Sequence, residues 1–366
     1  MVLIARDGKV VHYQAYGFLD ASKSKPMGMG AYFRIASMTK PIVATTAMMM
    51  AEQGHFLLID PISKYLPEFQ NMMVEVRKAE GSGYELVPAA KPITIQDLLR
   101  HTSGFTYAFL LDDSRAAIRD AYRKARIEQI DGGISGDQML KSLAKIPLLH
   151  QPGTRFEYSV SMDVLGLLLE RVTGKPLDTL VGEMVLKPLQ MKDTTFRFPP
   201  DKLPLLADAL DSDPLKATEW WKSFPPFEEM SGRYLMGGSG LISTAADYFR
   251  FCQMILNGGE LDGVRLLSPK TVELMLSNHL QDLAGSPEPM TGPGYGFGLG
   301  FAVRLDSGMA AVPGSKGDVS WAGACGTTFT IDPQERIIGI FLTAAPTGRV
   351  AKRLLFKNLL YSAVVK

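Results

Sequence analysis

The alternation of apolar and polar positions at the start of the chain predicts a β-hairpin. Residues 2–6 and 9–17 are rich in β-forming side chains, and they flank Asp7-Gly8, a two-residue hairpin turn signal. Residues 32–36 form a third extended segment. The next stretch, residues 38–53, is apolar on all sides and therefore predicts a buried helix.

Helical and loop patterns fill the middle of the chain, from about residue 60 to residue 235. Thr94 begins a capping box ahead of a short apolar run, and residues 112–130 are charged and amphipathic. Residues 159–171 carry enough leucine and valine for another buried helix. The stretch 199–230 is rich in proline and aromatic residues, which indicates an ordered but irregular excursion.

Strand patterns return in the last third of the chain. Residues 295–305, 319–331 and 337–343 alternate or run apolar, and turn signals separate them. A closing amphipathic helix follows at about 347–365. Two strands from the start and three from the end predict one antiparallel sheet, interrupted by a helical insertion.

A chain of 366 residues exceeds the size of a single hydrophobic core, so either one large two-lobed unit or two domains are expected. We expect an α+β fold, an α/β sandwich with an all-helical insertion. Residues 1–60 and 236–366 would form a discontinuous α/β domain around the central antiparallel sheet. Residues 61–235 would form a mostly helical domain.

Composition and charge exclude several classes of protein. Hydrophobic residues make up 46% of the chain and charged residues 21%, as in ordinary globular proteins. The net charge of +1, without any Lys/Arg block, implies neither nucleic acid nor an anionic membrane as a partner. No run approaches roughly 18 apolar residues and the start has no signal-peptide pattern, so we expect a cytoplasmic protein.

Cysteine and histidine usage supports the same interpretation. Cys252 and Cys325 lie in apolar surroundings far apart in the sequence, which predicts buried free thiols in a reducing compartment. The five histidines are scattered without metal-binding spacing. We therefore expect neither a metal site nor a cofactor.

The tetrapeptide Ser37-Met38-Thr39-Lys40 opens the first buried helix and is the strongest candidate for chemistry. Ser37 and Lys40 are about one turn apart, so their side chains lie on one face of the helix. A serine hydroxyl becomes a good nucleophile when a neighbouring base takes its proton, and Lys40 is the nearest base. Taken alone, the tetrapeptide fits equally well a lysine that extends to solvent beside a capping serine.

Two further segments supply what such a nucleophile needs. Tyr158 precedes a buried helix, and its phenol can accept and return a proton. Residues 321–326 begin a strand whose small residues let a backbone N–H approach a substrate carbonyl and complete an oxyanion hole. Taken singly, a half-buried aromatic ring and glycines in a crowded strand also explain these two segments.

In chain order, Ser37-Met38-Thr39-Lys40, Tyr158-Ser159-Val160 and Trp321-Ala322-Gly323 resemble the three motifs of the serine β-lactamase and penicillin-binding-protein superfamily. The resemblance covers nearly the whole chain. It is closest to family VIII carboxylesterases, which share the class C β-lactamase fold, and it implies an active site in the cleft between the two domains.

The resemblance also implies a role for each motif. Ser37 would be acylated, and Lys40 and Tyr158 would move its proton, with the division between them left open because such a pair titrates as a unit. The backbone N–H groups of Ser37 and Ala324 would form the oxyanion hole. Water would then hydrolyse the acyl-enzyme.

Two positions differ from the β-lactamase motifs. Val160 stands where penicillin-recognising relatives usually carry an amide side chain, and Trp321-Ala322-Gly323 replaces a lysine-threonine-glycine motif. The lost groups would bind the carboxylate and amide of a lactam. The substitutions therefore favour neutral, apolar esters, with Trp321, Gly323 and Val160 as substrate-binding residues.

Two irregular stretches, 199–230 and the Pro/Gly-rich loop 283–298, are expected to form walls of the cleft, because loops on rigid scaffolds usually shape sites. The aromatic residues in and beside them are candidates for the pocket lining: Trp220, Trp221, Phe224 and Tyr295. Core packing explains each of these side chains equally well.

We therefore expect a carboxylesterase that hydrolyses short- to medium-chain acyl esters through an acyl-Ser37 intermediate, with a small-molecule ester as its partner. Weak β-lactam hydrolysis beside ester hydrolysis would fit the same site. The alternatives are a β-lactamase or D-Ala-D-Ala peptidase, an acyltransferase that uses an alcohol in place of water and, least favoured, a catalytically silent binding relative.

Overall fold

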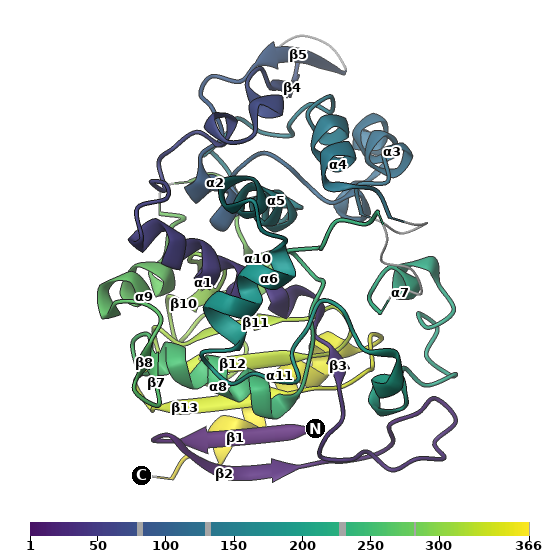
Figure 1. The fold of residues 1–366 in the computed structure, drawn as a ribbon, viewed down its shortest axis with the longest axis vertical. Coiled ribbons are helices and arrows are strands. Elements are labelled where there is room, and N and C mark those ends of the chain that lie inside the picture. Colours follow the sequence, from purple (N-terminus) through teal and green to yellow (C-terminus); the bar gives the residue numbers. More distant parts are fainter. Residues whose placement is uncertain (79–82, 129–132, 227–231, 282, 366) are drawn as a thin grey trace.

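The main sheet of the molecule is built from the two ends of the chain (Figure 1). A computed structural model describes residues 1–78, 83–128, 133–226, 232–281 and 283–365. Within these residues the sheet has seven antiparallel strands in the order β2-β1-β13-β12-β11-β10-β9. Its strands are β1 Val2–Arg6, β2 Lys9–Gln14, β9 Tyr295–Phe297, β10 Ala302–Arg304, β11 Val319–Ala322, β12 Thr328–Asp332 and β13 Ile337–Phe341.

The first hairpin is confirmed. Asp7 and Gly8 both have positive φ, 51° and 75°, as the tight turn between β1 and β2 requires. The inward-facing Leu3 and Ala5 of β1 are buried and pair with Ile340 and Ile338 of β13. The start of the chain is thereby joined to its end.

The expectation of three strands in the last third was wrong in number. Residues 295–305 fold into β9 and β10, because Gly300 adopts φ 93° and the chain turns between them. Residues 319–331 likewise form β11 and most of β12, and Gly326 at φ 120° lies in the turn between them. Residues 295–341 therefore supply five strands of the main sheet.

The extended segment predicted at residues 32–36 is also longer than the strand in the structure. Only Phe33–Arg34 form a strand, β3, which pairs with β6, Ile242–Ser243, outside the main sheet. Ala36 has φ 44°, and a short 3₁₀ turn, Ala36–Met38, begins there. This turn leads straight into α1, Thr39–Glu52, whose residues Thr39 to Met50 are all buried, as the apolar pattern predicts.

Two helices cover opposite faces of the sheet. On one face lies α8, Ala245–Leu256, where the Tyr248 ring is 5.1 Å from Phe329 of β12. On the other lies α11, Arg349–Ser362, where the Phe356 ring stacks 5.3 Å from Phe341 of β13. The closing helix is thus confirmed, with slightly shorter bounds than expected.

The middle of the chain is mainly helical and lies above the sheet in Figure 1. Thr94 caps α2 through a capping box with Asp97, as predicted, and α5 covers most of the expected helix at 159–171. The other described elements are α2 Ile95–Leu99, α3 Ala116–Lys124, α4 Gly136–Leu143, α5 Ser161–Thr173, α6 Leu177–Val181, α7 Glu219–Lys222, α9 Pro269–Leu276, α10 Glu288–Thr291, β4 Met73–Arg77, β5 Tyr84–Pro88, β7 Glu260–Leu261 and β8 Val264–Arg265.

Two predicted stretches extend beyond the described residues. Residues 129–130 of the amphipathic stretch and 227–230 of the irregular excursion lie outside them. The described part of the excursion contains one short 3₁₀ helix and α7, so it is irregular as expected.

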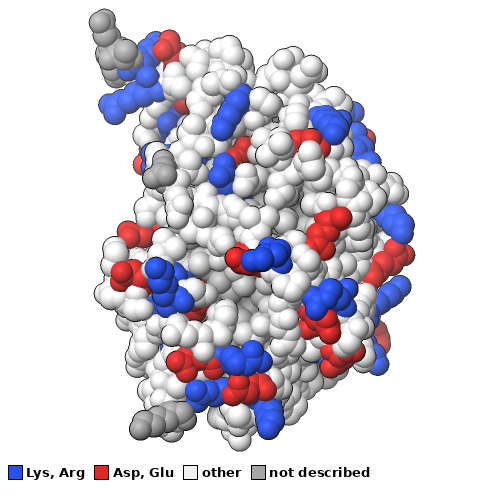
Figure 2. Space-filling model, turned by 90° about the vertical axis from the view of Figure 1, so that its left-hand side faces the viewer, with Lys and Arg blue, Asp and Glu red and all other residues white. Residues whose placement is uncertain are grey.

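The surface and the thiols match the composition. On the face shown in Figure 2, acidic and basic side chains are interspersed. Cys252 and Cys325 are both free and buried, as predicted. Among the described residues, no helix combines the length and hydropathy needed to cross a bilayer.

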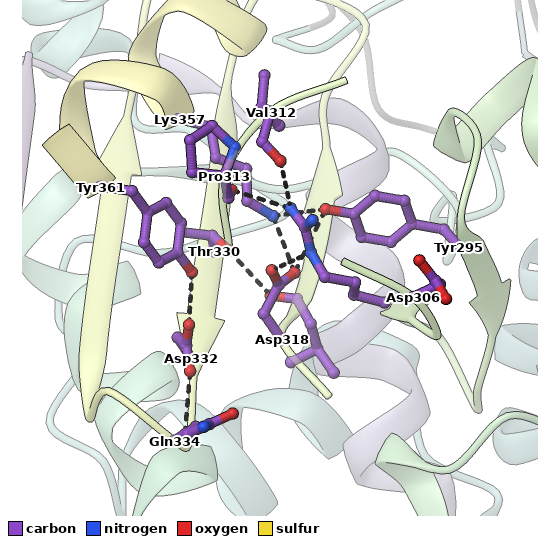
Figure 3. Close-up of polar contacts among 12 residues, drawn as sticks. Tyr295, Asp306, Val312, Pro313, Asp318, Thr330, Asp332, Gln334, Lys357 and Tyr361 are labelled. Carbon is purple, nitrogen blue, oxygen red and sulfur yellow. Dashed lines mark hydrogen bonds and ion pairs between the residues drawn. The ribbon is translucent and has the colours of Figure 1, made fainter. Parts of the chain in front are cut away.

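A buried ionic network joins α11 to the sheet (Figure 3). Arg304 of β10 and Asp318, just before β11, are both 0% exposed and form an ion pair at 2.6 Å. Lys357 of α11 bonds the same carboxylate at 2.8 Å and the Tyr295 hydroxyl at 2.7 Å. Asp318 is therefore the shared acceptor that holds two buried cations.

Removing the charge of Asp318 should destabilise the fold strongly. Asp318→Asn would leave Arg304 and Lys357 as buried cations without their carboxylate, and we expect the free energy of unfolding to fall by about 3–5 kcal/mol in urea titrations. The exposed pair of Lys270 and Glu273 is the control. Glu273→Gln should change stability by at most about 0.5 kcal/mol, and an equal loss in both variants would contradict this account.

Candidate active site

Ser37 lies in the 3₁₀ turn between β3 and α1. The preceding Ala36 is buried with a positive φ of 44°, a conformation that costs energy for a residue with a Cβ. Backbone bonds hold the turn in place: the Ile35 N–H donates to the Leu241 carbonyl at 3.2 Å. The turn brings the Ser37 hydroxyl to the surface of a cavity.

Lys40, at the start of α1, is 0% exposed and points its amine at three oxygen atoms. Its Nζ lies 2.8 Å from the Gly238 carbonyl oxygen, 3.2 Å from Ser37 Oγ and 3.3 Å from the Tyr107 hydroxyl oxygen. An ammonium group has three N–H donors, so each has an acceptor. The alternative of a lysine that extends to solvent is therefore wrong.

Tyr158 approaches Ser37 from the segment before α5. Its hydroxyl donates to Ser37 Oγ at 2.8 Å, and Lys40 Nζ lies 4.6 Å from the centre of its ring. The ring is buried between aromatic neighbours: His101 at 4.8 Å and Trp321 at 5.5 Å between centroids. Hydroxyl, amine and phenol thus converge although 121 residues separate Ser37 from Tyr158.

The loop after β11 lies directly beside the Ser37 turn. A Cβ on Gly323 would be 2.2 Å from the Ile35 carbonyl oxygen, so only glycine permits this approach. In the described part of the chain, neither the Ser37 nor the Ala324 amide donates to a backbone carbonyl. Both residues border the same cavity, so these two N–H groups are candidates for an oxyanion hole.

The site opens into a cavity of about 200 Å³ with a mainly apolar lining. Several predicted substrate-binding residues border it. They are Val160, Trp220, Phe224 and Trp321, together with Ser37, Tyr158 and Ala324.

The other predicted lining residues lie elsewhere. Trp221 is buried with Ala36 and Cys325 behind the Ser37 turn, and the Arg34 guanidinium lies 5.1 Å from its ring. Tyr295 belongs to the ionic network under α11 (Figure 3). For both side chains the core-packing alternative holds. Gly323 approaches Ile35 and does not border the cavity.

Sequence reasoning missed several polar residues of this cavity. Among them are Tyr107, Glu128, Asp163, Arg349 and Arg353. The first three come from the helical part and the two arginines from α11, where Arg353 also donates to the Gly323 carbonyl. One signal was available: the polar Asp163 interrupts an otherwise apolar helix pattern. The cavity is therefore less apolar than the motif substitutions imply.

Burial controls the charge states around the site. It raises the pKa of Asp163 to about 6, against the opposing effect of the Lys40 charge, and raises the pKa of Glu128 to about 7. Burial and the Lys40 charge lower the pKa of His101 well below its usual value. The imidazole behind Tyr158 is therefore neutral near pH 7.

The fold and this geometry define a serine hydrolase. The chain belongs to the beta-lactamase family, whose family model matches residues 1–361. Esterase EstB of Burkholderia gladioli is 30% identical over 346 residues, covering 91% of this chain and 82% of EstB. Protein Rv1367c of Mycobacterium tuberculosis is 36% identical over 340 residues, with the same two coverages.

Solved structures agree with this membership. The structure titled "EstCE1, a hydrolase with promiscuous acyltransferase activity" superposes with a TM-score of 0.78 at 29% identity, covering 98% of this chain and 92% of EstCE1. These similarities confirm the predicted class C β-lactamase-like α+β fold and the place of the chain among family VIII carboxylesterases.

Tyr107 offers a direct test of how Lys40 is held. Tyr107→Phe keeps the ring but removes one acceptor of a buried ammonium, a contact worth about 1.5–3 kcal/mol. We expect kcat for p-nitrophenyl butyrate to fall about tenfold or more. Tyr122 is the control, because its buried hydroxyl accepts from the Thr106 N–H and does not reach Lys40. Unchanged kcat in Tyr107→Phe, or an equal loss in Tyr122→Phe, would refute the assignment.

Proposed function

We propose that this chain is a carboxylesterase that hydrolyses short- to medium-chain acyl esters through an acyl-Ser37 intermediate. One observation carries the proposal: the Ser37 hydroxyl lies 2.8 Å from the Tyr158 hydroxyl and 3.2 Å from Lys40 Nζ, beside an open cavity. The similarity to EstB and EstCE1 supports the same reaction class.

In the acylation step, Ser37 Oγ attacks the ester carbonyl carbon and loses its proton to the Tyr158 and Lys40 pair. The pair accepts that proton in its reactive state, which holds one proton fewer than a phenol and an ammonium together. The carbonyl oxygen becomes an oxyanion, and the N–H groups of Ser37 and Ala324 stabilise it. The tetrahedral intermediate then collapses, and the alcohol leaves with the proton that Tyr158 returns. Deacylation repeats these steps with water in place of Ser37.

The apolar part of the cavity supports the substrate class. Val160 and Trp321 present hydrocarbon and an indole face next to Ser37, where an acyl chain gains free energy by leaving water. An indole supplies one N–H donor and no charge, so it does not replace the ammonium group of a lactam-binding lysine. This favours neutral acyl groups over lactams.

We also propose the domain division expected above, with residues 1–60 and 236–366 in one domain and 61–235 in the other. Ser37 and Trp321 come from the first and Tyr158 and Val160 from the second, which supports a site in the cleft between them. The two free buried thiols support a cytoplasmic location.

Covalent labelling tests the nucleophile. A serine-directed alkyl phosphonate should add to Ser37, as mass spectrometry of the peptides would show, and Ser37→Ala should lower ester turnover by about 10⁴-fold or more. Ser142 heads another S-x-x-K sequence with Lys145 and is the matched control. Labelling at Ser142 or undiminished turnover in Ser37→Ala would end the proposal. Nitrocefin should be turned over far more slowly than p-nitrophenyl butyrate.

Acyl transfer is a second candidate function, because the EstCE1 title names that activity and the acyl-enzyme would be the same. Adding a primary alcohol to the hydrolysis of a p-nitrophenyl ester decides it. Appearance of the new ester at an unchanged rate of p-nitrophenol release would show partitioning of a common acyl-Ser37. Acid as the sole product at every alcohol concentration would exclude the transferase activity.

A further inference from the structure

Asp163 is a buried carboxylate in the first turn of α5, and Gly238 connects it to Lys40. The Gly238 N–H donates to Asp163 Oδ1 at 3.1 Å, and the Gly238 carbonyl accepts from Lys40 Nζ at 2.8 Å. Asp163 is only 4% exposed, yet it borders the same cavity as Ser37. A carboxylate that is buried this deeply needs a specific partner.

The contact between Asp163 and Gly238 is tight. A Cβ on Gly238 would lie 2.7 Å from Asp163 Oδ2 and 3.1 Å from the Tyr107 hydroxyl oxygen. The neighbouring Gly237 is equally close to α5, because a Cβ there would lie 2.4 Å from the Met162 carbonyl oxygen. Glycines at these two positions let the segment 237–241 pack directly against the start of α5.

The same segment is bound to α1 on its other side. The Leu241 N–H donates to Thr39 Oγ1 at 3.0 Å, next to Lys40. The segment is therefore held between α5 and α1. Gly238 alone therefore connects the Asp163 carboxylate to the Lys40 amine through hydrogen bonds.

The charges around Asp163 identify what its carboxylate does. Three ionisable groups interact electrostatically with it. Burial raises the pKa of Asp163, whereas the charge of Lys40 in α1 lowers it. Burial and the charge of Asp163 raise the pKa values of Tyr107, ahead of the turn Ala108–Leu110, and of Glu128, after α3. Lys40 is the cation among these three groups. The Asp163 carboxyl and the Lys40 amine therefore belong to one buried network that Gly238 joins.

We propose that Asp163 is a positioning residue, which holds the Gly238 carbonyl against Lys40 Nζ and supplies the negative charge opposite the ammonium group. This inference rests on the proposed acyl-Ser37 chemistry. Asp163 forms no bond to the substrate in that reaction. Its negative charge lies in the same buried network as the groups that take up the Ser37 proton, so it favours the transfer of that proton to them.

The substitution Asp163→Asn separates charge from geometry. The amide oxygen keeps an acceptor for the Gly238 N–H, while the negative charge is lost. We expect kcat/KM for p-nitrophenyl butyrate to fall about tenfold at its plateau. The acid limb of its pH profile, measured from roughly pH 5 to pH 9, should move to lower pH by about one unit, because the negative charge that favours a bound proton nearby is gone.

A matched control is available in Asp247. It is also a buried carboxylate in the first turn of a helix, and it accepts from the Asp193 N–H at 2.7 Å and from Thr194 Oγ1 at 2.9 Å. Asp247→Asn should leave the acid limb where it is. A shift of equal size in Asp247→Asn, or an unmoved limb in Asp163→Asn, would overturn the proposal.

A second variant covers the case in which Asp163→Asn does not fold. Gly238→Ala keeps every charge but pushes a methyl group toward Asp163 Oδ2, so kcat should fall about tenfold while the acid limb stays in place. Unchanged kcat in Gly238→Ala would overturn the positioning role. Phosphonate labelling of Ser37 in the wild-type chain keeps the two proposals distinct. If Ser37 is labelled but the variants keep the wild-type kcat and acid limb, only the role of Asp163 is refuted. If Ser37 is not labelled, the esterase mechanism itself is refuted.

Discussion

The burial of the Lys40 ammonium is the constraint that organises the site. Removing such a cation from water costs several kcal/mol unless each donor finds an acceptor. The three acceptors belong to separate parts of the chain: Ser37 in the same turn, Tyr107 in the helical part and Gly238 before β6. These segments must therefore meet around one amine, and the Ser37 hydroxyl lies where they meet.

A second buried ionic cluster fixes α11, the helix that brings Arg349 and Arg353 to the cavity. Asp318 joins β10 and α11 through Arg304 and Lys357, and α11 in turn carries Arg353 to the Gly323 carbonyl beside Ser37. Groups fixed on strands and helices are held more precisely than groups on free loops. The sheet and α11 thus preorganise the N–H groups that an oxyanion would need.

The fold alone does not select the substrate, because the proteins similar to this chain include an esterase and a hydrolase with promiscuous acyltransferase activity. Here the lining has two characters. Val160 and Trp321 make part of the wall apolar, while Glu128 and Arg349 add ionisable groups to it. The lining of this cavity therefore depends on side chains outside the three motifs as well as on Val160 and Trp321.

The sequence by itself determined the elements whose signals are local: the Asp7-Gly8 hairpin, the buried helix that Ser37 and Lys40 open, and the order of the three motifs. Periodicity and turn chemistry act over a few residues, so they can be recognised without a structure. The lengths of the later strands and the roles of Tyr107, Asp163 and Tyr295 were decided only by tertiary structure. Their partners are distant in sequence, and contacts across such distances leave no periodic pattern in a single chain.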